Sequence, residues 1–335
     1  MATIRAYELR GTELTQVTRP EPIAAAGHVV VQIHATSLNY RDLMIQRGNY
    51  ALQAKPGVVP LSDGAGEVVA VGPGVTQFAV GDRVAATFMQ SWTSGPLEPH
   101  HGASALGGAL DGTLAGRVAF PETGLVRIPD HLSFAQAATL PCAGVTAWNA
   151  LFEAGVTRPG QTVLVQGTGG VSILALQLAR AAGARVIVTS SSDAKLARAR
   201  ELGAAATINY KATPAWGDEA VRLTGGVGVD HVIEVGGAGT FEQSLAAIRL
   251  GGTISYIGLL AGTGASPVGA ILRKGARVHG IFVGSRAMFR SLNAAIAESR
   301  IAPVIDRVFP FAEAVDAYRY LESGAHVGKV VIAVD

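Results

Sequence analysis

The chain has 335 residues, which is longer than one ordinary hydrophobic core and predicts two domains. Hydrophobic residues make up 49% and charged residues 16%, which excludes a disordered polar chain and indicates a large buried core. The formal net charge of +2 comes without a run of Lys or Arg, so we expect no nucleic-acid partner.

Cysteine content and apolar runs indicate the compartment. The single cysteine, Cys142, excludes an intramolecular disulfide and favours a reducing cytoplasm. The first residues contain no apolar signal core, and no apolar run reaches the length of a bilayer span. We therefore expect a soluble, cytoplasmic protein with no membrane partner.

The first 123 residues have the pattern of a β-rich domain. Short apolar runs at residues 29–33, 66–71 and 81–86 alternate with glycine turns, which is typical of a partly closed β-barrel or sandwich. Residues 91–116 break this pattern and include Trp92, His100 and His101. We interpret this stretch as a long surface loop whose histidines are solvated.

From residue 161 onward, strands and helices alternate. This order predicts a parallel sheet covered by helices on both faces, and so an α/β fold for this part of the chain. A helix near residues 311–323 and a strand at 329–334 follow. The alternating segments are strands at 162–165, 185–189, 206–210, 229–235 and 253–257, and helices at 171–182, 193–202 and 241–250.

The strongest motif is the glycine-rich turn Gly167-Thr168-Gly169-Gly170, which leads into Val171 and a helix. Glycine permits the tight turn and a close approach of the backbone to a pyrophosphate, while the helix N-terminus supplies free N–H groups. Ser172 stands where the usual fingerprint has a third glycine, and serine is small enough for helix–strand packing. The strand–turn–helix context predicts a dinucleotide site rather than a plain turn.

The end of the next strand indicates which dinucleotide binds. An NAD site usually has an acid here that binds the ribose 2′-hydroxyl, but this strand ends Thr189-Ser190-Ser191. These hydroxyls, together with Lys195, suit a 2′-phosphate. Asp193 already belongs to the start of the helix, where an acid complements the helix dipole. The sequence therefore favours NADP(H).

Motifs along nearly the whole chain resemble the medium-chain dehydrogenase/reductase family, and within it the zinc-independent quinone oxidoreductases and the zinc-type alcohol dehydrogenase-like proteins. Besides the glycine turn, the matching segments are Asn39-Tyr40-Arg41-Asp42, DGAGEVV at 63–69, VGDRV at 80–84, LPCAGVTAW at 140–148 and GKVV at 328–331.

The resemblance implies a discontinuous GroES-like catalytic domain, residues 1–123 and 299–335, around a Rossmann NADP(H)-binding domain, residues 124–298. It also adds positions to the cofactor site, which would lie at the carboxyl ends of the parallel strands. These added positions are Tyr210, Val235, Gly236, Ile257, Phe282, Val283 and Lys329.

The same resemblance argues against a metal. Where zinc enzymes of the family have a ligand cysteine this chain has Asn39, and where they have a His-Glu pair it has Ser62-Asp63. Only Cys142 falls at a ligand position, and one cysteine cannot form the four-cysteine structural site. We therefore expect a zinc-independent enzyme.

Without a Lewis acid, alcohol oxidation lacks its usual stabilisation of an alkoxide, whereas reduction of a quinone or an activated C=C bond needs only donors to a developing oxyanion. By resemblance, Asn39 and Tyr40 open a helix at the site, and the Asn39 amide would donate to a substrate carbonyl or to the cofactor ribose. Asp42 would orient its neighbours. Tyr50 is a second donor or, equally, an aromatic core residue.

We therefore expect an NADPH-dependent reductase of quinones or α,β-unsaturated carbonyls, whose partner is a small-molecule carbonyl or quinone substrate. Two alternatives stay open: an alcohol dehydrogenase or aldehyde reductase, and a non-catalytic, crystallin-like cofactor-binding protein. An apolar edge strand at residues 275–283 resembles the family's dimer edge and predicts a homodimer.

Overall fold

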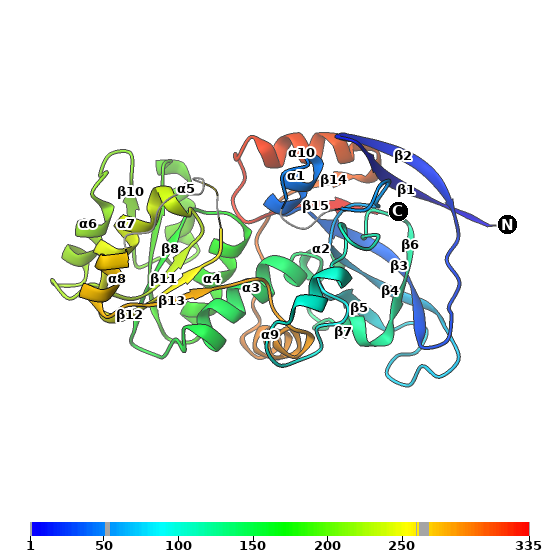
Figure 1. The fold of residues 1–335 in the computed structure, drawn as a ribbon, viewed down its shortest axis with the longest axis horizontal. Coiled ribbons are helices and arrows are strands. Elements are labelled where there is room, and N and C mark those ends of the chain that lie inside the picture. The colour runs from blue at the N-terminus through cyan, green and yellow to red at the C-terminus, as the bar shows by residue number, and fades with distance from the viewer. Residues whose placement is uncertain (1, 51–53, 259, 261–267, 335) are drawn as a thin grey trace. The chain divides into compact units, whose positions relative to one another are not determined.

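The computed structural model describes residues 2–50, 54–258, 260 and 268–334. By their packing these residues divide into two units, one of which runs to Val145 and resumes at Gly284, while the other comprises Thr146–Val283. Each unit is built on its own sheet (Figure 1).

The first unit is rich in short strands and contains the described chain ends. Its strands are β1 (Thr3–Arg10), β2 (Glu13–Pro20), β3 (His28–Ser37), β4 (Asp63–Val71), β5 (Arg83–Ala86), β6 (Arg117–Pro121), β7 (Leu125–Arg127), β14 (Ile305–Pro310) and β15 (Lys329–Ala333). Its helical segments are α1 (Tyr40–Gln46), η1 (Pro99–Ser104), η2 (Glu122–Gly124), α2 (Phe134–Ala137), η3 (Leu140–Gly144), α9 (Arg286–Ser299), η5 (Phe311–Glu313) and α10 (Ala314–Glu322).

The sheet of this unit has the strand order β14-β15-β3-β4-β5-β7, with β6 also paired to β3. β3 runs antiparallel to β15, β4 and β6, so the end of β3 lies between the starts of β15 and β4. The β1–β2 hairpin pairs separately and turns at Gly11, whose φ of +61° suits glycine. These strands confirm the predicted GroES-like β-fold.

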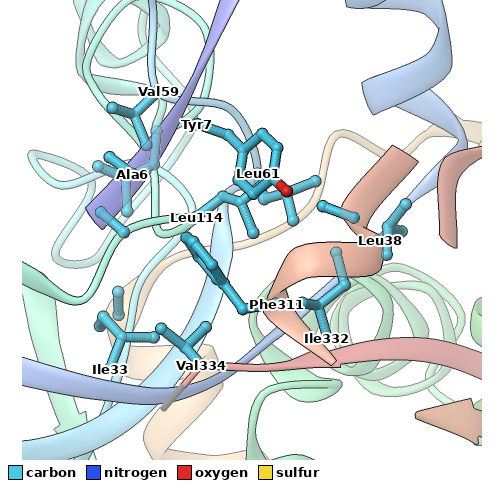
Figure 2. Packing of buried hydrophobic residues seen from close by; sticks show 14 of the residues in the cluster. Ala6, Tyr7, Ile33, Leu38, Val59, Leu61, Leu114, Phe311, Ile332 and Val334 are labelled. Carbon is cyan, nitrogen blue, oxygen red and sulfur yellow. The ribbon is translucent and has the colours of Figure 1, made fainter. Parts of the chain in front are cut away.

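Buried side chains from distant segments form the core of the first unit (Figure 2). Tyr7 of β1 packs against Phe311 of η5, with ring centroids 5.1 Å apart. Leu61 and Leu114 come from the connecting loops and are fully buried. Burial of such a side chain stabilises the fold by about 1.5–3 kcal/mol, so this core joins the N-terminal and C-terminal parts of the unit.

The second unit has the alternating order that the sequence predicts. Its strands are β8 (Thr162–Gln166), β9 (Arg185–Ser190), β10 (Ala206–Asn209), β11 (Val229–Glu234), β12 (Ile248–Tyr256) and β13 (Arg277–Gly280). Its helical segments are η4 (Asn149–Ala154), α4 (Gly170–Ala181), α5 (Asp193–Glu201), α6 (Trp216–Leu223), α7 (Ala238–Ala247) and α8 (Val268–Lys274), while α3 (Val145–Trp148) contains the division between the units.

All strand pairs in this sheet are parallel, in the order β10-β9-β8-β11-β12-β13. Apolar residues of β8 are fully buried, as a strand covered on both faces requires. The direction of strand order reverses between β8 and β11, which makes the carboxyl ends of these two strands the topological switch point. The predicted Rossmann fold is confirmed.

The boundaries of the two packed units differ from the predicted domain boundaries. Residues 124–145 and 284–298, which the sequence prediction assigns to the cofactor domain, pack in the first unit. In particular, Arg286 of α9 donates to the carbonyl of Leu125 (2.7 Å), and Asn293 donates to the carbonyl of Arg127 (2.8 Å). The boundaries 1–123, 124–298 and 299–335 therefore remain a prediction about the family's domains rather than a description of packing.

Part of residues 91–116 differs from the predicted surface loop, although residues 93–100 are exposed as expected. Trp92 and His101 are buried and their rings stack with centroids 5.7 Å apart, while the backbone N–H of Glu98 donates to His101 Nδ1. The carbonyls of Trp92 and Thr93 accept from the first N–H groups of α9. The expectation of solvated histidines is thus wrong for His101, because tertiary stacking buries it, whereas His100 is exposed.

None of the helices in the described part of the chain has both the length and the apolar character that a bilayer span requires.

Candidate functional site

Three strand ends of the first unit bring together residues that are far apart in the sequence. Because β3 lies antiparallel between β15 and β4, its carboxyl end meets their amino ends. Asn39 follows β3, Asp63 begins β4 and Lys329 begins β15. The sheet topology therefore places an amide, a carboxylate and an ammonium group in one buried cluster.

Lys329 is the centre of this cluster. Its side chain is only 3% exposed, so it is not a solvated strand-end charge. Nζ donates to the carbonyl of Leu38 and to Asn39 Oδ1, both at 2.6 Å, and lies 3.7 Å from Asp63 Oδ2. An ammonium group has three N–H donors; two of them make these hydrogen bonds, and the Asp63 carboxylate lies near enough to balance the charge.

The contact with Lys329 fixes which way the Asn39 amide points. Because an ammonium group only donates, the amide oxygen and not the amide nitrogen must face Lys329. Asn39 Nδ2 then points elsewhere, and among the described residues this buried nitrogen has no hydrogen-bond partner. An unpaired buried donor costs about 1–3 kcal/mol, so it marks a place where a ligand acceptor would be stabilised.

Asp63 is held on both carboxylate oxygens. Ser62 Oγ donates to Oδ1 (2.7 Å), while the Cys142 backbone N–H donates to Oδ2 (3.3 Å). Desolvation, and then the nearby Asp63 carboxylate, raise the pKa of the Cys142 thiol above its ordinary value. Across the described residues, no group of three or more His, Cys, Asp or Glu side chains gathers as a metal site would require.

The remaining predicted residues of this unit lie in helix α1 or shortly after it in sequence. Asp42 Oδ2 accepts from the backbone N–H of Asn39 (2.7 Å), and Asp42 Oδ1 lies 3.6 Å from Arg41 Nη1. Burial raises the pKa of Asp42 to about 6, although Arg41 and the Asn39 N–H oppose that shift. Tyr40 is 45% exposed.

Tyr50 packs against a small cluster of buried apolar residues. The Arg41 guanidinium lies over its ring, 5.1 Å from the centroid. Desolvation raises the pKa of the Tyr50 hydroxyl. This placement suits the aromatic-core alternative, and the catalytic roles of Tyr40, Asp42 and Tyr50 remain predictions.

The glycine turn of the second unit has the geometry that a pyrophosphate site needs. Gly167 follows β8 with a φ of +70°, and a Cβ built on Gly169 would meet only open space. Gly169 is the N-cap of α4. The N-terminus of this helix offers the N–H groups of its first turn, such as that of Val171, to a ligand. Ser172 Oγ donates to the Gln166 carbonyl (2.7 Å), so serine closes the turn onto the strand.

The end of β9 carries the residues predicted to select the cofactor. Thr189 and Ser190 are buried there, and the Tyr210 N–H donates to the Ser190 carbonyl (3.1 Å), which places Tyr210 beside this strand end. Ser192 caps α5 by accepting from the Lys195 N–H. Asp193 accepts from Asn209 Nδ2 (2.8 Å).

Sequence reasoning missed two buried polar residues at the topological switch point. Gln166 ends β8 and Glu234 ends β11, and Gln166 Nε2 donates to Glu234 Oε2 (2.6 Å). Gln166 Oε1 accepts from the N–H groups of Val235 and Gly236 (3.2 Å each), and Glu234 Oε1 also accepts from Gly236. A polar residue at the end of an apolar parallel strand is the signal that could have found them.

The other predicted cofactor positions follow β12 and β13. The Ile257 N–H donates to the Glu234 carbonyl (2.8 Å), which joins this loop to the one after β11. Val283 has a φ of +53°, which is strained for a β-branched residue, and Asn149 Nδ2 holds its carbonyl (2.7 Å). Phe282 is 37% exposed.

Comparison with known proteins matches both units. Residues 25–130 match the family model described as the alcohol dehydrogenase GroES-like domain, and residues 170–298 match the zinc-binding dehydrogenase model. A zinc-type alcohol dehydrogenase-like protein from Schizosaccharomyces pombe is 50% identical over 316 residues, covering 92% of this chain and 91% of that protein.

Solved structures agree with this match. A putative alcohol dehydrogenase from Sinorhizobium meliloti 1021 has a TM-score of 0.94 and 42% identity, covering 99% of both chains. A structure described as an NAD-dependent alcohol dehydrogenase has a TM-score of 0.88 and 34% identity, covering 99% of this chain and 100% of that one. The chain therefore belongs to the medium-chain dehydrogenase/reductase family and is an alcohol dehydrogenase-like oxidoreductase.

Proposed function

We propose that this protein is a zinc-independent, NADPH-dependent reductase of quinones or α,β-unsaturated carbonyls. The observation that carries this proposal is the buried Asn39 Nδ2, a hydrogen-bond donor with no partner among the described residues. Its amide oxygen is already bound to Lys329, so the nitrogen is available to an acceptor on the substrate.

The chain's residues supply an oxyanion donor. When bound, the reduced nicotinamide cofactor supplies the hydride that an electron-poor carbon accepts. Reduction of a conjugated carbonyl places negative charge on its oxygen, and Asn39 Nδ2 would donate to that oxygen. Asp42 holds the backbone of Asn39 and Lys329 holds its side chain, so the donor is fixed before substrate binds.

The second unit fits the dinucleotide. The open space beside Gly169, the positive φ of Gly167 and the N-terminus of α4 suit a pyrophosphate. At the end of β9, serine hydroxyls and Lys195 suit a 2′-phosphate. Asp193, the nearest acid in sequence, already binds Asn209, which supports NADP(H) over NAD(H).

Alcohol dehydrogenation is the second candidate, because the relatives are named alcohol dehydrogenases. In that direction a carbonyl is the product, and the Asn39 donor would bind its oxygen equally. The two candidates differ in the substrate they require and in whether turnover needs zinc.

A substrate panel separates them. NADPH oxidation is measured with a quinone, an enone and an aldehyde, and NADP⁺ reduction with primary and secondary alcohols, each with a control lacking enzyme. We expect turnover on the quinone or enone that survives dialysis against a strong chelator, and lower efficiency with NADH. Turnover of alcohols alone, with stoichiometric zinc whose removal abolishes it, would refute the proposal. Tight NADPH binding without any turnover would favour a non-catalytic protein.

A further inference from the structure

The positions at which zinc enzymes of the family would hold their metal surround Lys329 in this structure. Asn39 stands at the first ligand position and Ser62-Asp63 at the family's His-Glu pair, and Asn39 Oδ1 and Asp63 Oδ2 face the Lys329 ammonium at 2.6 and 3.7 Å. Cys142, at the third, contributes its backbone N–H to the same Asp63 carboxylate. The cluster already contains a cation.

The donor set of this cluster does not fit zinc. The Asn39 amide oxygen is bound to Lys329, and the Asp63 oxygens accept from Ser62 Oγ and the Cys142 N–H. A divalent ion would have to share these oxygens with a buried ammonium group, and repulsion between cations a few ångströms apart is strong where water is excluded. Zinc ligation also asks for thiolate, imidazole or free carboxylate, which this arrangement does not offer together.

We infer that the Lys329 ammonium replaces the metal ion as the resident cation of this site and acts as a positioning residue that turns the Asn39 amide so that Nδ2 faces the substrate. The lysine balances the buried Asp63 charge, as a metal would. Its bond to Asn39 Oδ1 excludes the flipped amide, in which two donors would face each other. The part that concerns substrate rests on the proposed function; the replacement of the metal does not.

The metal arm of the test needs no substrate. Chelator-treated wild type, Lys329→Met, Lys329→Arg and Lys274→Met are titrated with Co²⁺, which reports thiolate ligation by its absorption, and with Zn²⁺ by calorimetry. Lys274 is the matched control, because its ammonium group also makes two hydrogen bonds, here to two backbone carbonyls (3.1 and 2.7 Å), but lies in the second unit.

Removing the ammonium frees the Asn39 and Asp63 oxygens, so Lys329→Met should bind Co²⁺ at least about tenfold tighter than wild type. Lys329→Arg and Lys274→Met should match wild type. If Lys329→Met does not fold, Lys329→Gln takes its place, since its amide still donates to an oxygen. Equal affinity of wild type and the neutral variants, or stoichiometric metal in wild type, would overturn the inference.

The kinetic arm tests positioning through Asn39. If Lys329 acts by turning that amide, Lys329→Met should lower kcat more than it changes KM, and it should cost little further kcat in an Asn39→Ala background. Fully additive losses in the double variant would show that Lys329 acts otherwise, with melting temperatures measured on each sample. If the wild type reduces neither enones nor quinones, the proposed function fails. The metal titrations would still test whether Lys329 occupies the place of the metal ion, because they need no substrate.

Discussion

Replacing Asn39 tests the oxyanion donor most directly. Asn39→Ala removes Nδ2, and loss of one such donor costs on the order of 3 kcal/mol, or about a hundredfold or more in kcat. KM should change less, because the charge that Nδ2 would stabilise develops in the transition state.

The structure also gives the expected effect on stability. Asn39→Ala leaves one N–H of the buried Lys329 ammonium without its acceptor, which costs about 1.5–3 kcal/mol. The same change removes the unpaired Nδ2, which itself costs about 1–3 kcal/mol in the folded protein. These two terms oppose each other, so we expect a small change in the free energy of unfolding.

Two further variants separate catalysis from helix capping. Asn39→Asp keeps an oxygen for Lys329 and a good N-cap residue but loses the donor, so kcat should fall while the melting temperature holds. Ser285→Ala is the matched control: Ser285 caps α9 by accepting from the Met288 N–H (3.3 Å). It should lose about 1 kcal/mol of stability and keep kcat.

The assay measures kcat, KM and melting temperature on the same samples with an enone or quinone. An undiminished kcat in both Asn39 variants, with lowered stability in Asn39→Ala, would make Asn39 a helix cap and remove it from the site.

Three other measurements follow from the structure. Lys195→Ala should raise the KM for NADPH with little effect on NADH, because a charge-assisted phosphate contact is worth roughly 1.5–3 kcal/mol; better use of NADH by the wild type would contradict this. Burial raises the pKa of Asp42 from 3.8 to about 6, so its contribution to stability is full below pH 4 and is lost as pH rises through 6. The free energy of urea unfolding is measured for wild type and Asp42→Asn at several pH values. Relative to wild type, the variant should become more stable by up to about 3 kcal/mol between pH 4 and 7.5, and a stability difference that does not change with pH would refute the prediction. Edge strand β13 (Arg277–Gly280) predicts a homodimer, which a monomeric mass by light scattering at micromolar concentration would contradict.

Local patterns predicted most of the second unit. The strand–glycine–helix order around Gly167 and the alternation after it depend on neighbours in sequence, so apolar periodicity and glycine were enough to predict the sheet. Local patterns do not reveal which strands lie next to each other in the sheet, or which side chains meet across it. The Gln166–Glu234 contact joins residues 68 positions apart and depends on β8 lying beside β11.

In the first unit, the sequence mainly failed to predict which polar and aromatic residues are buried. The glycines and prolines around His101 indicate a loop, and they do not reveal that Trp92 stacks on this histidine. Lys329 is similar: a lysine at a strand end is usually solvated, and its burial is tolerable here because the buried oxygens of Leu38, Asn39 and Asp63 face it.

The cluster around Lys329 joins the two chain segments of the first unit, which is discontinuous in sequence. Lys329 and Asn39 are 290 positions apart, yet β15 pairs with β3 at the residues that lead into Asn39. Without β15 in the sheet, Asp63 would lose its ion pair with Lys329 and the Asn39 amide would lose its hydrogen bond to the same side chain. Return of the C-terminal strand thus does more than close the core: it completes the polar site and sets the direction of the donor that the proposed reaction uses. Any change that loosens β15 should therefore impair turnover before it unfolds the β3–β4 part of the sheet, which pairs independently of it.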